Sequence, residues 1–192
     1  KVFLLANTGA PYFGQLQQEF PPDKDGVIRV HSTITSVIDN AGLQAARGDV
    51  VLALPGFAET LTAAMSLTLA GVHWLGVGKG NATPTITVNA ATHGIAIAAN
   101  NITFENFKFA APGTDAALSM IHIDDDAVGC TIKDVTGIGS DDTNNFVNCI
   151  AIGARANDHR LENIRLSTSK TVAVTNFLNF EGPTSRSYIG GF

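Results

Sequence analysis

The sequence has little charge and no long apolar run, and each absence excludes a class of protein. Only 15% of the 192 residues are charged and 45% are hydrophobic, a balance that excludes a disordered chain. The formal charge is −5 and basic residues are not clustered, so we expect neither nucleic acid nor an anionic membrane as a partner. No stretch approaches the roughly 18 apolar residues of a membrane span. We therefore expect a soluble protein made in the cytoplasm.

The chain is also poor in the residue patterns that carry chemistry. Its two cysteines, Cys130 and Cys149, fall in different predicted strands and at different parity, so we predict two free thiols. The five histidines show no metal-ligand spacing, and His159 takes an inward slot that Ile102 and Cys130 take elsewhere. No G-x-S-x-G motif is present. We predict no catalytic residue, no metal and no cofactor.

What the sequence does contain is a repeat: apolar, polar, apolar, charged, Asn or Asp, apolar. Copies of this six-residue pattern lie at 72–77, 102–107, 130–135, 159–164 and 187–192. The inward residues at the third position are Trp74, Phe104, Ile132, Leu161 and Ile189. They follow one another at steps of 30, 28, 29 and 28 residues. A fixed period of this size indicates a solenoid or a related array.

Each copy is preceded by a second apolar strand, and the intervals leave room for a third, seen best at 84–88. The last apolar residues of the second strand are Leu69, Ile97, Ile123, Ile152 and Phe180. Three short strands per period and no helix in the repeat predict an all-β, parallel β-helix with coils of about 28 residues. A β-propeller needs a longer period, near 40 residues, and four strands per blade.

The fifth position of the repeat predicts a corner of the coil. Asn106, Asp134 and Asn163 occupy it, and both residue types accept the left-handed conformation that a sharp turn needs. Gly76 and Gly191 hold the same position in the outer copies. We predict that the side chains of Asn106, Asp134 and Asn163 form a structural ladder.

The N-terminal part of the chain does not follow the repeat. Residues 1–31, which contain Pro11, Pro21 and Pro22, predict an extended arm, packed on its own domain or reaching a neighbouring subunit. An amphipathic helix at 33–46 is predicted to cap the open end of a β-helix that spans 32–192. The last copy of the repeat ends on Phe192 without a polar cap, so we expect the chain to continue or a partner to cover that end.

Three segments carry a resemblance to a known family. Gly48–Gly56 (GDVVLALPG), Gly71–Gly78 (GVHWLGVG) and Ile102–Phe107 (ITFENF), together with the helix, resemble the pectate-lyase-like right-handed parallel β-helix superfamily. Around 47–56 and 71–84 the likeness is greatest to β-helix proteins of tailed-bacteriophage virions. This resemblance implies a capsid decoration, head fibre or tail spike, often trimeric, assembled in the host cytoplasm. It implies no chemistry, because the fold hosts lyases, hydrolases, esterases and inert structural parts.

The strongest charge cluster is Asp124, Asp125 and Asp126. In a polysaccharide-cleaving β-helix such carboxylates would bind calcium or act as acid and base. The repeat instead places Asp126 in the slot of Asn100 and Arg155, which predicts an exposed ion pair one coil apart. We keep the three aspartates and Arg155 as a candidate ligand site.

Two further segments have a simpler interpretation. Ser140-Asp141-Asp142-Thr143 is similar to the Asp-Asp element of polygalacturonase-like glycosidases, but the Gly-His-Gly and Arg-Ile-Lys companions are missing, so we expect a loop between coils. Residues 76–80 (GVGKG) lack Walker spacing and a following helix, which indicates a glycine-rich corner.

Two functions therefore remain. The first is a non-enzymatic structural part of a bacteriophage virion, a symmetric homo-oligomer such as a trimer whose partners are other virion proteins. The second is a β-helix that binds or cleaves polysaccharide.

Overall fold

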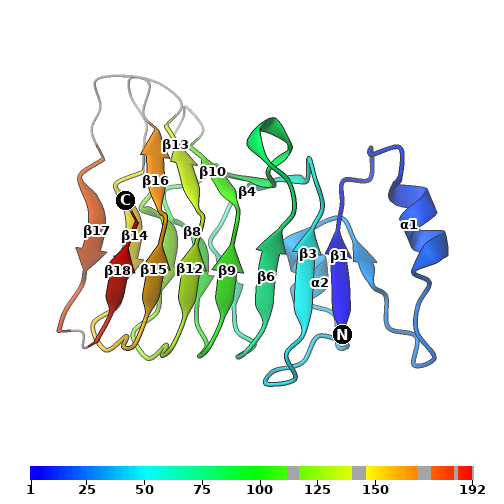
Figure 1. Cartoon of the computed structure of the whole chain (residues 1–192), viewed down its shortest axis with the longest axis horizontal. Helices are drawn as coiled ribbons and strands as arrows, with labels where there is room; N and C mark the ends of the chain where they lie inside the picture. The colour runs from blue at the N-terminus through cyan, green and yellow to red at the C-terminus, as the bar shows by residue number, and fades with distance from the viewer. Residues whose placement is uncertain (112–116, 140–145, 168–173, 184–185, 192) are drawn as a thin grey trace.

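The chain winds into about six stacked coils of about 28 residues, and the predicted parallel β-helix is confirmed (Figure 1). The computed structural model describes residues 1–111, 117–139, 146–167, 174–183 and 186–191. Each complete coil contributes one strand to each of three sheets, and every pairing between strands is parallel.

The first sheet has eight strands in the order β18-β15-β12-β9-β6-β3-β1-β2. Its strands are β1 (Val2–Leu5), β2 (Val30–His31), β3 (Val50–Ala53), β6 (His73–Gly76), β9 (Thr103–Glu105), β12 (Thr131–Lys133), β15 (Arg160–Glu162) and β18 (Tyr188–Gly190). The second sheet has five strands, β4 (Ala58–Leu61), β7 (Thr85–Val88), β10 (Lys108–Ala110), β13 (Thr136–Ile138) and β16 (Arg165–Ser167). The third sheet also has five, β5 (Met65–Leu67), β8 (His93–Ile97), β11 (Ser119–Ile123), β14 (Asn148–Ile152) and β17 (Asn176–Phe180).

The inward side chains stack from coil to coil and form one core. Trp74 pairs with Phe104, Phe104 with Ile132, and Ile132 with Leu161, in the register that the repeat predicts. These four side chains are at most 2% exposed. Stacking of this kind removes each apolar side chain from water on both faces of its coil, which stabilises the fold by roughly 1.5–3 kcal/mol per large residue.

The predicted left-handed corner is confirmed at four of its five positions, one of which is Gly191, with a φ of 70°. Asn106, Asp134 and Asn163 have φ angles of 59°, 52° and 50°. Gly76 holds the predicted slot, because Leu75 pairs with Glu105 and places Gly76 level with Asn106, but its φ is not positive. Glycine is needed there for space, since a Cβ atom would lie 2.0 Å from the Asn106 carbonyl oxygen. The chain beyond Gly76 leaves the repeat, and Val77 is 37% exposed rather than inward.

Two further details of the predicted register are wrong. Leu67, not Leu69, pairs with Ile97 in the third sheet, so the first step is two residues longer than predicted. Asn100 does not share the slot of Asp126. Its side chain accepts a hydrogen bond from the Val128 nitrogen at 2.9 Å, which places it two residues further along the turn.

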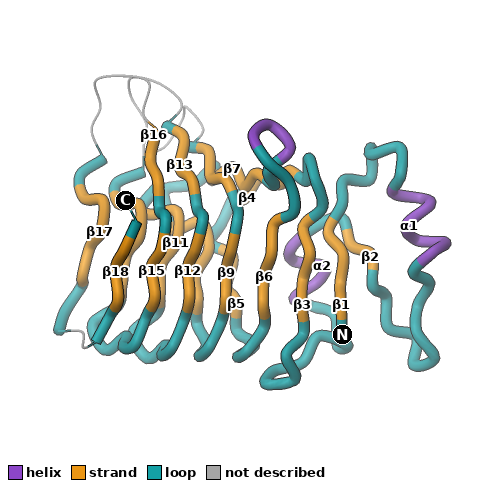
Figure 2. Tube along the Cα trace, in the orientation of Figure 1, coloured by secondary structure: helices purple, strands orange, loops and turns teal. Residues whose placement is uncertain are grey.

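Residues 1–31 do not form the predicted extended arm. β1 lies inside the first sheet, where it pairs with β3 from Val2↔Val50 to Leu5↔Ala53, and β2 pairs with its other edge. A short helix, α1 (Phe13–Glu19), lies between β1 and β2 in the chain, at the N-terminal end of the stack (Figure 2), and none of its residues is buried. The four apolar residues of β1 cover the β3 edge, whose backbone groups would otherwise be unpaired.

The capping helix is shorter than predicted. α2 (Ile34–Ile38) begins at the Thr33 cap, which accepts from the Ser36 nitrogen at 3.1 Å, and packs into the core near β1, β2 and β5. It ends early because the Asn40 side chain accepts from the Gly42 nitrogen at 2.8 Å and turns the chain. The third helical element is a single 3-10 turn, η1 (Gly80–Ala82).

Candidate functional site

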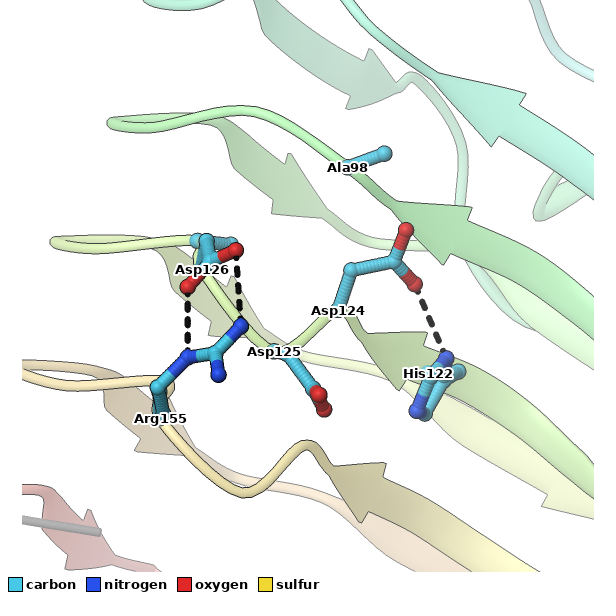
Figure 3. A pocket seen from close by; sticks show the side chains of 7 residues that line it. Ala98, His122, Asp124, Asp125, Asp126 and Arg155 are labelled. Atoms are coloured by element: carbon cyan, nitrogen blue, oxygen red, sulfur yellow. Dashed lines mark hydrogen bonds and ion pairs between the residues drawn. The ribbon is translucent and has the colours of Figure 1, made fainter.

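The candidate site lies where the coil becomes wider. The turn between β8 and β9 has five residues, 98–102, whereas the turn between β11 and β12 has seven, 124–130. The two additional residues make the later turn project beyond the earlier one. The step leaves a hollow of about 440 Å³ above the aspartates, lined by Ala98, His122, Asp124, Asp125, Asp126, Ala127 and Arg155 (Figure 3).

Asp126 and Arg155 are paired as predicted, on adjacent coils. The Arg155 Nε and Nη2 atoms donate to the two carboxylate oxygens at 2.8 and 3.1 Å. The hydrogen bonds from Arg155 and its charge lower the pKa of Asp126. Because the side chains are 79% and 69% exposed, water screens the pair and it contributes little to stability.

Asp125 is held by the backbone of the next coil. Its Oδ1 accepts a hydrogen bond from the Ala154 nitrogen at 3.0 Å. This approach requires glycine at position 153, where a Cβ atom would lie 2.6 Å from the Asp125 nitrogen. The Asp125 carboxylate therefore helps to stack two wide turns.

Asp124 pairs with His122, which lies at an outward position of β11. The Asp124 carboxylate lies 2.9 Å from His122 Nδ1, and Glu181 Oε2 lies 3.3 Å from His122 Nε2 (Figure 3 draws the first contact). Glu181 follows β17, two coils away, and the residue that pairs with His122 on the intervening coil is Ala151. The small alanine side chain leaves space for Glu181 to reach across the intervening coil.

A second histidine completes this cluster. The His93 ring stacks on the His122 ring with centroids 4.3 Å apart, and His93 Nδ1 lies 2.8 Å from the Ser119 hydroxyl. Burial lowers the pKa of His93, and the neighbouring His122 acts in the same direction. The roles of His93, His122 and Glu181 were not predicted, because they depend on contacts between coils that the repeat does not specify.

The charged groups of the site are thus largely satisfied by one another. Asp124 and Glu181 contact opposite nitrogens of the His122 ring, so they do not converge on one point as metal ligands would. Among the residues that the structure describes, no group of three or more His, Cys, Asp and Glu side chains is placed to hold a metal ion.

The other predicted residues have structural roles. Asn106 Nδ2 donates to the Gly76 and Gly78 carbonyls at 2.7 and 3.1 Å, which fastens the glycine-rich corner, and Asn163 Nδ2 donates to Asp134 Oδ1. Cys130 and Cys149 are free and buried, as predicted, and burial raises the pKa of the Cys149 thiol to about 12. Residues 140–143 and Phe192 lie outside the described residues.

Comparison of the chain with protein-family models, with curated proteins and with solved structures found no match in any of the three. Within the described part of the chain, no helix has the length and apolar character needed to cross a membrane.

Proposed function

We propose that the chain is a non-enzymatic structural component of a bacteriophage virion, such as a capsid decoration, head fibre or tail-spike-type protein. Its place in the virion rests on the resemblance of residues 47–56 and 71–84 to phage β-helix proteins. The observation that carries the non-enzymatic part is the internal pairing of the candidate site: Arg155 holds Asp126, and His122 lies between two carboxylates.

A general acid or base must reach the substrate proton, whereas the Asp126 carboxylate is occupied by Arg155 on the adjacent coil. Parallel strands whose side chains stack from coil to coil give a stiff rod that presents a fixed surface. We propose that the chain works as a homo-oligomer, with a trimer as one arrangement, against other virion proteins.

The test is quantitative mass spectrometry of gradient-purified particles of a phage that encodes the chain. A constant number of copies per particle, in a ratio to the major capsid protein that does not change on further purification, is the expected result. Recovery only in the soluble fraction of the lysate would contradict the proposal. Sedimentation equilibrium of the isolated chain measures its association with itself.

The alternative function is binding or cleavage of polysaccharide in the hollow beside Asp124. Its supporting observation is the widened turn, which exposes three aspartates, an arginine and a histidine around one open space. Incubation with a panel of anionic polysaccharides, followed by assays for unsaturated and reducing-end products, separates the two functions. Turnover that Asp126→Ala abolishes and Asp25→Ala leaves intact would establish the alternative.

A further inference from the structure

One inward slot of the first sheet changes from apolar to polar along the solenoid. In successive coils this slot, directly before the strand, holds Val72, Ile102, Cys130, His159 and Ser187. His159 is 1% exposed, like the apolar residues before it. An ionisable ring therefore replaces a core hydrocarbon between β12 and β18.

One backbone hydrogen bond holds the His159 ring in a neutral form. The Cys130 backbone nitrogen donates to His159 Nδ1 at 3.3 Å, so this nitrogen must carry a lone pair and the ring proton sits on Nε2. Within the described residues, the buried Nε2 atom has no hydrogen-bond partner, and neither has the Ser187 hydroxyl one coil further on. A second proton would have to bind Nδ1. The protonated Nδ1 and the Cys130 N–H group would then both be donors, and their hydrogen bond would be lost.

The charged groups around the ring do not stabilise its protonated form. Asp158 precedes His159 in the chain, but Arg186 engages both of its carboxylate oxygens at 3.0 Å. Arg160 pairs with Glu162 on the outer surface, and the Cys130 thiol on the preceding coil lies 3.4 Å from the Ala99 carbonyl. Burial lowers the pKa of His159 although Asp158 acts in the opposite direction.

We propose that His159 is an acid-sensitive latch: proton uptake by its buried ring separates β15 from β12 and opens the C-terminal part of the solenoid, β15 to β18. A cationic ring in an apolar interior is strongly disfavoured. The ring becomes hydrated at the lowest free-energy cost when the edge of its coil moves into water. The separation also breaks the Cys130–His159 hydrogen bond and uncovers the inward slots of the preceding coil.

The direction of the effect follows from proton linkage. The closed form binds the second proton more weakly than the open form, whose histidine has the ordinary pKa near 6.5. The latch is therefore fully closed above pH 6.5 and loses stability as the pH falls below it. If one proton is taken up, the open population rises up to about tenfold per pH unit until the lowered pKa of the closed form is reached.

Hydrogen-exchange mass spectrometry of the whole chain between pH 7.5 and 5, corrected for the chemical exchange rate, tests the latch. We expect protection in β15 and β18 to fall by up to about fivefold between pH 6.5 and 5.5, while β3 and β6 stay protected. His159→Ile, which carries the side chain found two coils earlier, should remove this dependence. His73→Gln, at an outward histidine, should retain it. Equal pH dependence in the wild type and His159→Ile, or simultaneous loss along the whole solenoid, would refute the proposal.

A second measurement does not depend on the fold of a variant. The ring signals of His159, followed by NMR in the wild-type chain, should keep the Nε2–H tautomer above pH 6.5. They should broaden or shift below it together with the β15 amides. If His159 titrates with a midpoint near 6.5 while the β15 amides stay protected, the ring takes up its proton in place and the latch does not exist.

Discussion

Arg155 lies one coil beyond Asp126 and donates hydrogen bonds to both of its carboxylate oxygens, at 2.8 and 3.1 Å. Each side chain sits in a seven-residue turn, and the step of 29 residues between them equals the step between the paired strands β11 and β14. The pair therefore reports the register of the coils directly, although both side chains are largely in water.

This exposed pair should be nearly dispensable for stability. Because water and salt screen it, Asp126→Ala and Arg155→Ala should unfold in urea at midpoints indistinguishable from wild type, and the double variant should show no coupling beyond error. A shared, clearly lowered midpoint in both single variants would mean that the wide turns depend on the pair.

The left-handed corner at Asp134 should discriminate sharply among substitutions. Its φ of 52° suits Asn and Gly, whereas a β-branched residue clashes with the backbone. We expect Asp134→Asn to keep the free energy of unfolding within about 0.5 kcal/mol and Asp134→Val to lose about 1–2 kcal/mol or more. Urea unfolding at pH 7 measures both. Equal losses in the two variants would show that the side-chain contact with Asn163, not the backbone, governs this corner.

Gly76 should tolerate no side chain at all. A Cβ atom there would lie 2.0 Å from the Asn106 carbonyl oxygen, so the corner must shift, and we expect Gly76→Ala to cost about 1–3 kcal/mol or more of unfolding free energy. Gly9→Ala is the matched control, because nothing lies within 4 Å of its added methyl group. Equal thermal unfolding midpoints for Gly76→Ala and Gly9→Ala would contradict the crowding seen at Gly76.

Asp49 should make the N-terminal coil sensitive to strong acid. The Asp49 carboxylate is fully buried, and burial alone would raise its pKa. Hydrogen bonds from Arg47, the α-amino group of Lys1 and the Gln44 backbone nitrogen lower the pKa to about 2. The stabilisation is therefore present above the ordinary value of 3.8 and disappears as the pH falls from about 4 to about 2.

The effect of this carboxylate is about 2 kcal/mol, because each pKa unit corresponds to about 1.4 kcal/mol. Urea unfolding of wild type and Asp49→Asn between pH 5 and pH 2 should show a steep decline only in the wild type. Asp25→Asn, at a carboxylate 59% exposed, should decline as the wild type does. Parallel curves for all three chains would assign the acid sensitivity to other carboxylates.

The repeat predicted the main features of the fold because each coil repeats them locally. Inward residues such as Phe104 and Ile132 recur at the coil period, and Asn106 and Asp134 mark a corner whatever surrounds them. A second left-handed corner, formed by Asn101, Gly129 and Asp158 in successive coils, was not predicted. Three different residue types occupy it, so the sequence shows no regular pattern at this position.

What the sequence by itself determined is therefore the coil: its period, its three strands, its inward slots and one of its corners. These features depend on alternation and turn chemistry within about 28 residues. Only the tertiary structure decided where β1 inserts, how the wider turn opens a hollow at Asp124, and that Glu181 reaches His122 across Ala151. Such contacts join residues from non-adjacent coils or from outside the repeat, and the free energy that selects them comes from the assembled stack rather than from any local pattern.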